Sequence, residues 1–335
     1  MLVVRIFRLE YDAQQSRNDR MKFNLHRIQI TRLRYYGMAL LILASPLAMA
    51  VEPDPESSEE ESGSLVIERI ERERAAQDNR AVLLAHKRNY VLPLTYANQP
   101  NDDVFEVGSS DFGEDLDNLE IQFQLSLKAP LAEDLLMEGD VLFFGFTVRS
   151  FWQAYNQDIS APFRETNYEP EIYWATPVPW QILGGDASFV AVGLSHQSNG
   201  RSQLFSRSWN RVYTTLVWER WRYVFALKAW WRIPEDDKDD PLDPDGDDNP
   251  DIEDFLGNFE FTVAYRKYDH EVSVMLRNNL DTDDNRGAIQ VDWTFPMHRR
   301  FRGYVQLFNG YGESLIDYDA DIERIGVGIL LSDLL

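Results

Sequence analysis

The chain of 335 residues contains no cysteine, and this absence removes two classes of protein. A small fold held together by disulfides is excluded, and so is a metal site built from cysteine thiolates. The absence does not by itself identify a cellular compartment, because large exported barrels and sandwiches often contain no cysteine.

Basic residues are scarce relative to acidic ones. The chain carries 33 Lys and Arg against 56 Asp and Glu, which gives a formal net charge of -23. The first 50 residues hold 8 basic and 3 acidic residues, so the remainder holds 25 and 53 and has a net charge of -28. Phosphate binding needs clustered Lys and Arg, so this composition argues against nucleic acid as a partner. Cationic partners such as divalent metal ions are favoured instead.

Long apolar runs are also missing after residue 50, since no segment has 18 consecutive apolar residues. A membrane-spanning helix is therefore not expected in that part of the chain. Residues 21–50 do show the pattern of a secretory signal peptide. A basic stretch without acids precedes a short apolar core at 37–44, and Ala-Met-Ala at 48–50 forms a cleavage site. We expect export through the Sec pathway, with residues 1–20 as an upstream extension.

Two different patterns follow the cleavage site. Residues 51–63, VEPDPESSEEESG, are acidic and poor in apolar residues, so they are expected to be disordered. From Ser64 to Lys87, apolar residues recur at helical spacing, first at Ile67 and Ile70 and again over 81–85. This spacing predicts a short helical leader.

From residue 89 onward the hydrophobic pattern has the period of two that indicates β-strands. The candidate strands are 89–97, 118–129, 139–150, 168–175, 187–197, 209–219, 222–232, 258–267, 270–279, 287–295, 301–310 and 323–333. Their lengths match the roughly 9 to 11 residues that a tilted strand needs to cross hydrocarbon. Tight connections such as Arg220-Trp221 alternate with long polar ones such as 233–257, as in outer-membrane barrels.

These features together predict an all-β fold. We expect a transmembrane antiparallel β-barrel of 12 strands over 89–335, preceded by an acidic, partly helical periplasmic segment at 51–88. Several tryptophans stand near predicted strand ends, where a barrel carries aromatic girdles: Trp152, Trp174, Trp180, Trp209, Trp218, Trp221, Trp230 and Trp231. Aromatic residues favour strands in general, but the barrel explains the signal peptide and the strand lengths as well.

One predicted strand ends in GLSHQSNGRS, residues 193–202. Side chains alternate between the two faces of a strand, so Leu194, His196 and Ser198 share a face with the apolar residues Val190 and Val192. This is the more uniformly apolar face, and in a membrane barrel it points at lipid. His196 and Ser198 are therefore predicted to lie next to each other on the outside of the barrel, near the rim.

The next strand begins in SRSWNRVY, residues 206–213, and a hairpin between the two strands would bring Asn210 alongside His196. Serine becomes a strong nucleophile when a base removes its proton, and histidine can do this near neutral pH when a third group orients the imidazole. Asn210 can provide that orientation, and the N–H of Gly200 is a candidate oxyanion donor. On these residues alone, a rim turn with incidental polar residues is favoured, and a serine lipase at the membrane rim is the alternative.

At these residues the sequence resembles the outer-membrane phospholipase A family, also known as detergent-resistant phospholipase A. The resemblance includes SHQSNGRS and SRSWNRVY, the earlier RSFWQ and PFRETNYEP, and the later DNPDI and GYGESLIDY. It extends in order over most of residues 85–335 and does not cover residues 1–84.

The resemblance implies a twelve-stranded barrel in the outer membrane with the catalytic triad His196, Ser198 and Asn210 on its outer surface. The implied activity is calcium-dependent hydrolysis of acyl esters, at sn-1 and sn-2, in membrane phospholipids and lysophospholipids. It also implies that the active form is a homodimer with Ca2+ at the interface beside the triad.

By position, the resemblance places the ion on the Arg201 carbonyl and the Ser206 hydroxyl of one protomer, with Ser160 contributed by the other. Oxygen ligands of this kind suit calcium.

Two other functions remain possible on the residues alone. A non-catalytic porin-like barrel would also have polar residues facing the lumen, such as Glu120, Gln122 and Gln124. A secreted soluble binding protein is the second alternative. The acidic stretch at 235–254 has carboxylates at spacings that can bind calcium, but it lacks the EF-hand pattern, and a solvated loop with loosely held counterions is favoured there.

Overall fold

The computed structural model describes residues 64–77, 82–106, 116–158, 161–240, 242–243, 245–298 and 301–333. The upstream extension, the signal peptide and the acidic stretch predicted over 1–63 lie outside the described residues.

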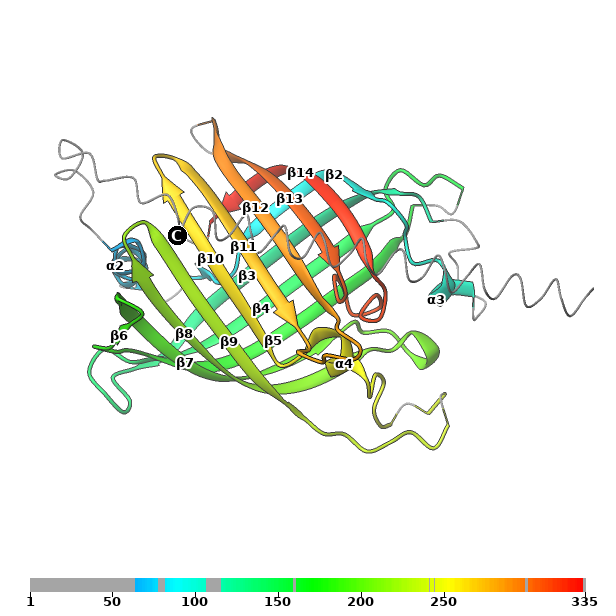
Figure 1. Ribbon diagram of the computed structural model, residues 1–335, viewed down its shortest axis with the longest axis horizontal. Coiled ribbons are helices and arrows are strands. Elements are labelled where there is room, and N and C mark those ends of the chain that lie inside the picture. The colour runs from blue at the N-terminus through cyan, green and yellow to red at the C-terminus, as the bar shows by residue number, and fades with distance from the viewer. Residues whose placement is uncertain are drawn as a thin grey trace, which may run out of the picture. The chain divides into compact units, whose positions relative to one another are not determined.

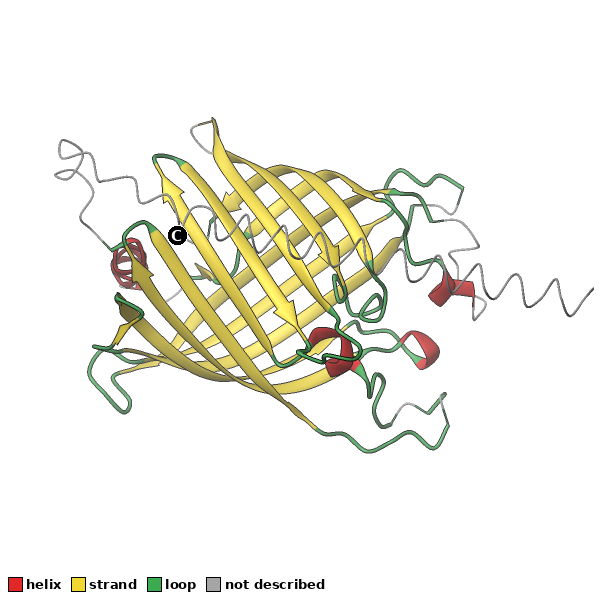
Figure 2. Ribbon diagram, in the orientation of Figure 1, coloured by secondary structure: helices red, strands yellow, loops and turns green. Residues whose placement is uncertain are grey.

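Twelve long antiparallel strands form one closed barrel (Figures 1 and 2). They are β2 (Asn89–Ala97), β3 (Leu119–Glu133), β4 (Val141–Trp152), β5 (Phe163–Pro177), β7 (Gly185–Ser198), β8 (Ser208–Arg220), β9 (Tyr223–Ile233), β10 (Phe259–Lys267), β11 (His270–Asn278), β12 (Gly287–His298), β13 (Phe301–Gly310) and β14 (Ile322–Ser332). Strands that follow one another along the chain are neighbours, and pairing of β14 with β2 closes the barrel. The predicted fold is confirmed.

The main error in strand length concerns β5, which was predicted over 168–175. The strand begins five residues earlier, at Phe163, because FRETN pairs with the end of β4 down to Trp152. Arg164 and Glu165 in this stretch are buried inside the barrel rather than in solvent. A hydrophobic period of two cannot register a strand end whose inward side chains are charged.

The predicted helical leader is only partly correct. Helix α2 (Leu65–Gln77) is present, but Leu84–Ala85 form a short strand, β1, that pairs with Leu127 and Lys128 of β3. β1 pairs with β3 beyond the residues of β3 that pair with β2. This backbone pairing outweighs the weak helical spacing of residues 81–85. The remaining short elements are α3 (Asp103–Glu106), β6 (Gln181–Ile182), the 3-10 helix η1 (Gln203–Phe205) and α4 (Ile252–Leu256). No helix in the described part of the chain is long and apolar enough to cross a membrane.

The first turn of α2 is fixed to the barrel wall by one carboxylate. Glu219 of β8 accepts hydrogen bonds from the hydroxyl of Ser64 at 2.6 Å and from the backbone N–H groups of Leu65 and Val66, both at 3.0 Å. These N–H groups have no partner within the helix, and a negative charge is favourable at a helix N-terminus. This contact holds α2 at the end of the barrel that carries the tight turns, such as the one after Arg220 (Figure 1).

The interior of the barrel is polar and densely paired. In one cluster Arg164 lies 2.5 Å from Glu120 and 2.6 Å from Asp317, and Arg324 contacts the same Glu120 at 3.0 Å. A second cluster joins Lys87, Glu169 and Arg211, and a third joins Arg88 with Glu271 and Asp292. A buried charge without a partner is strongly destabilising. Charged side chains can therefore point into the barrel only because they are paired in this way. Glu120 and Gln122 face inward as predicted.

The tryptophans near strand ends do not all belong to membrane girdles. Trp180, Trp221 and Trp231 are exposed, as the side chains of a girdle would be. Trp209 and Trp230 are buried and pack edge to face inside the barrel, with their ring centroids 6.2 Å apart. The guanidinium of Arg211 lies 4.0 Å from the Trp209 ring centroid. The two rings therefore pack against a charged side chain in the barrel interior and do not belong to a membrane girdle.

Candidate active site

The three predicted catalytic side chains come from the ends of β7 and β8, where these strands form a hairpin. On β7, Ala191, Gly193 and Ser195 are buried, whereas Leu194 and His196 are exposed, so the predicted assignment of faces is correct. His196 pairs directly with Asn210 of β8. The hairpin therefore places an imidazole and an amide next to each other on the outer wall.

A chain of hydrogen bonds runs outward from this histidine. His196 Nδ1 lies 2.9 Å from Asn210 Oδ1, and Asn210 Nδ2 donates to Glu235 Oε1, also at 2.9 Å. With the proton on Nδ1, His196 Nε2 keeps its lone pair and can act as a base. Ser198 lies two residues further along the same face, without a hydrogen bond to His196 among the described residues. Catalytic hydrogen bonds in ligand-free sites are often long and shorten when substrate binds.

The loop between the two strands is shaped by Asn199 and Gly200. The side chain of Asn199 accepts a hydrogen bond from Arg207 N at 3.0 Å and donates one to the Phe205 carbonyl at 2.8 Å. Gly200 has a φ of +66°, which is a left-handed conformation that favours glycine. A side chain at this position would also approach the ring of Tyr168. Gly200 therefore allows the backbone to turn sharply just beyond Ser198, where an oxyanion donor is needed.

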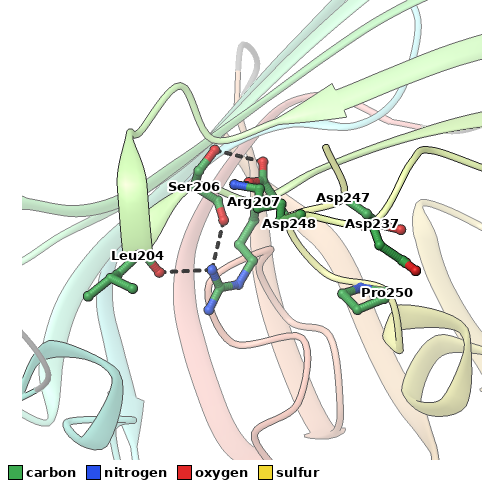
Figure 3. Close-up of a pocket in the computed structure, with 8 residues that line it drawn as sticks. Leu204, Ser206, Arg207, Asp237, Asp247, Asp248 and Pro250 are labelled. Carbon is green, nitrogen blue, oxygen red and sulfur yellow. Dashed lines mark hydrogen bonds and ion pairs between the residues drawn. The ribbon is translucent and has the colours of Figure 1, made fainter. Parts of the chain in front are cut away.

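Two of the predicted calcium ligands lie in the same loop. The Arg201 side chain reaches into the barrel, where it contacts Glu165 at 3.3 Å and the carbonyl of Arg164, so its backbone is firmly anchored. Ser206 Oγ donates to Asp248 Oδ2 at 2.7 Å (Figure 3). The third predicted ligand, Ser160, lies outside the described residues.

The contact with Asp248 shows that the acidic stretch at 235–254 is more than a solvated loop. Asp248 and Asp247 line a pocket of about 360 Å³ together with Leu204, Ser206, Arg207, Asp237, Lys238 and Pro250 (Figure 3). Two carboxylates of this pocket already form ion pairs, Asp248 with Lys238 and Asp247 with Arg232, both at 2.5 Å. No group of three or more His, Asp or Glu able to hold a metal is present among the described residues.

The oxygen donors of this loop nevertheless fit calcium. A hydroxyl, a carboxylate and a nearby backbone carbonyl are the hard ligands that the ion prefers. An ion at Ser206 would compete with Lys238 for Asp248, because one carboxylate serves both cations.

The family model for phospholipase A1 matches residues 66–331, which is most of the chain. The chain belongs to the phospholipase A1 family. A phospholipase A1 from Klebsiella pneumoniae is 35% identical over 257 residues, which cover 77% of this chain and 85% of that protein.

Solved structures agree with this assignment. Outer membrane phospholipase A from Escherichia coli superposes with a TM-score of 0.70 at 34% identity, covering 77% of this chain and 95% of that one. A variant of the same protein, described as an active-site mutant in which alanine replaces an asparagine, gives the same values. The outer membrane phospholipase of Salmonella typhi, solved as a dimer with bound calcium, has a TM-score of 0.69 at 33% identity, with coverages of 77% and 94%.

This phospholipase A1 family member is thus an outer-membrane enzyme, and its recognition from short motifs is confirmed. Two further residues, Glu235 and Asp248, contact the predicted site residues and were not predicted from the sequence. Glu235 stands two residues after Ile233, the partner of Asn210 in β9, but the sequence alone does not give this register. Asp248 stands in the DNPDI motif, but nothing in the sequence places that motif beside Ser206.

Proposed function

We propose that this protein hydrolyses the acyl esters of membrane phospholipids and lysophospholipids, at sn-1 and sn-2, with Ser198 as nucleophile, His196 as base and Asn210 as the group that orients the base. The observation that carries the proposal is the contact between His196 Nδ1 and Asn210 Oδ1 on the outer wall of a membrane barrel. A polar cluster on a wall that faces lipid is costly unless it serves a function. The solved active-site variant with a replaced asparagine, from a related enzyme, supports the role of the amide.

The reaction follows from these positions in two steps. Ser198 Oγ attacks the acyl carbonyl carbon while its proton moves to His196 Nε2, and the tetrahedral intermediate collapses as the imidazolium returns that proton to the departing lipid alcohol. Water then attacks the acyl-serine ester with the same base, which releases the fatty acid and restores the serine. Gly200 N–H is suited to stabilise the oxyanion, because it lies just beyond the nucleophile in a loop held by Asn199.

Calcium and a second copy of the chain complete the proposal. The related Salmonella enzyme is described as a dimer with bound calcium. In this chain the Ser206 hydroxyl and the Arg201 carbonyl would hold the ion, with Asp248 as a further oxygen donor beside Ser206. Ser160 would be contributed by the second protomer. When bound, the ion supplies positive charge that stabilises the developing oxyanion.

Hydrolysis of a phospholipid in detergent micelles tests this function, with the parent and Ser198→Ala compared in calcium and in EDTA. The parent should be active in calcium and lose that activity in EDTA. The variant should lose roughly 10³-fold or more in kcat, because loss of the nucleophile removes the whole triad function. Both should form the same folded barrel. A sulfonyl fluoride should label the parent at Ser198, and retained activity in the variant would refute the assignment.

A further inference from the structure

The Asn210 amide has two chemically different ends, and only one of them supports catalysis. If Oδ1 points at the imidazole, it accepts the proton of Nδ1 and leaves Nε2 free as the base. If the amide is turned over, its NH2 group faces Nδ1 and forces the proton onto Nε2, which disables the base. Asparagine carries no charge to select one orientation, so a further group must do so.

Glu235 provides that selection. Its Oε1 lies 2.9 Å from Asn210 Nδ2. An ionised carboxylate accepts hydrogen bonds and cannot donate them, so it can only face the NH2 end of the amide. With Nδ2 held by Glu235, Oδ1 must point to His196, as its 2.9 Å contact with Nδ1 requires.

The backbone explains why a glutamate can reach this position. Ile233 ends β9 and pairs with Asn210, and Pro234 follows. Proline has no N–H for the ladder and ends the strand there. Glu235, the first acidic residue of the loop, stands two residues past the strand end, and its side chain folds back onto the amide.

We propose that Glu235 is a positioning residue that acts through Asn210. It fixes the orientation of the amide and places a negative charge behind it, in line with the imidazolium that forms during the reaction. An aspartate in place of Asn210 would put a negative charge directly beside the imidazole. Here Glu235 supplies a negative charge one hydrogen bond further away. This inference rests on the proposed function of His196, Ser198 and Asn210.

The groups that flank this line of residues come from β5, β8, β9 and the acidic loop. The outer face of β5 brings Tyr168, opposite Ser198, and β9 brings Trp231 and Ile233. From β8 come Asn210 and Ser208, and the latter contacts the Asp248 carboxylate that is paired with Lys238. In the acidic loop, Asp236 adjoins Glu235, so it provides a control of the same charge one residue away.

The test compares Glu235→Gln and Glu235→Lys with Asp236→Asn and Asp236→Lys as matched controls. Hydrolysis of a p-nitrophenyl acyl ester in detergent micelles at saturating calcium is followed as kcat and KM across pH. The glutamine keeps an acceptor but loses the charge, whereas lysine offers only donors and should turn the amide over. We expect Glu235→Lys to lower kcat at least about tenfold through the wrong tautomer, with KM little changed.

Loss of the charge should also appear in the pH profile. The acid limb of kcat/KM should move to lower pH by about half to one pH unit in Glu235→Gln, because the imidazolium loses a nearby negative charge. The Asp236 variants should show neither effect. In an Asn210→Ala background, Glu235→Lys should cause no further loss, since the amide through which it acts is gone.

Unshifted acid limbs and parental kcat in both Glu235 variants, or equal effects in the Asp236 variants, would overturn this inference. So would a full additional loss in the Asn210→Ala background. Failure of the proposed function is a separate result, recognised by activity in Ser198→Ala. Each variant is first checked for a folded barrel by its heat-modifiable migration in gels.

Discussion

At the scale of single residues, His196 and Asn210 contribute different things although they are joined by one hydrogen bond. In the proposed mechanism the imidazole is the base, and its loss removes proton transfer. The amide orients the imidazole and adds no charge of its own. His196→Ala should therefore abolish hydrolysis, whereas Asn210→Ala should keep residual activity.

The measurement is kcat in detergent micelles for both variants, with the gel migration of the barrel as a control for folding. A partial loss in Asn210→Ala beside a complete loss in His196→Ala is the expected result. Equal and complete loss in two folded variants would mean that the assigned roles are wrong.

The residues of the site differ in how far sequence alone could place them. His196, Ser198 and Asn210 share an outer face by strand parity, and the hairpin brings two of them together, so their proximity could be predicted. Glu235 and Asp248 approach them from a loop without periodicity, and no pattern in the chain describes the path of such a loop. Their contacts depend on tertiary structure alone.

At the scale of elements, the turn between β3 and β4 is organised by one buried carboxylate. Asp140 accepts hydrogen bonds from the backbone N–H groups of residues 135–137 at 2.7 to 2.8 Å and from the Trp174 indole at 2.8 Å. Burial raises the pKa of the Asp140 carboxyl, but these hydrogen bonds outweigh burial and hold the pKa below its usual range.

This lowered pKa predicts a stability that depends on pH. A group whose folded pKa is depressed stabilises the fold above its unfolded pKa of about 3.9, and the contribution is lost as pH falls through the folded value. Asp140→Asn should lower the thermal unfolding midpoint in detergent at neutral pH, and the gap to the parent should narrow in acid. Glu138→Gln, an exposed carboxylate of the same turn, should have little effect. A gap that widens in acid would contradict the explanation.

Strand elements were the best predicted part of the fold, and the reason is physical. A barrel with a polar interior and an apolar outer wall imposes alternation on every strand, so a period of two appears directly in the sequence. The errors occur where that alternation stops. Charged inward residues concealed the start of β5, and β1 forms by pairing with β3 beyond the end of β2, which a local pattern cannot describe.

At the scale of the whole molecule, the proposed calcium ligands link metal binding to association. Ligands from two protomers share the ion in the proposal, so calcium should favour the dimer and the dimer should raise the affinity for calcium. Ser206→Asn should raise the calcium concentration for half-maximal activity, because a longer amide displaces an ion that prefers oxygens at roughly 2.3 to 2.6 Å. Activity at saturating calcium should partly recover.

A calcium titration of hydrolysis with parallel crosslinking in detergent measures both effects. Ser202→Asn is the matched control, since this serine is exposed in the same loop and is not a proposed ligand. Crosslinked dimer should fall in step with activity in Ser206→Asn and stay at the parental level in the control. An unchanged midpoint with a uniformly lower rate would place Ser206 in the chemistry or the local packing.

The paired charges inside the barrel also bear on the permeability of the cell envelope. Arg88 reaches Glu271 and Arg164 reaches Asp317, and in both cases the partners come from strands or loops that are not neighbours in the sheet. A solute that entered the bore would have to separate such pairs, which is costly. We therefore expect the barrel to add little to the permeability of the outer membrane to polar solutes, which conductance across a planar bilayer would measure.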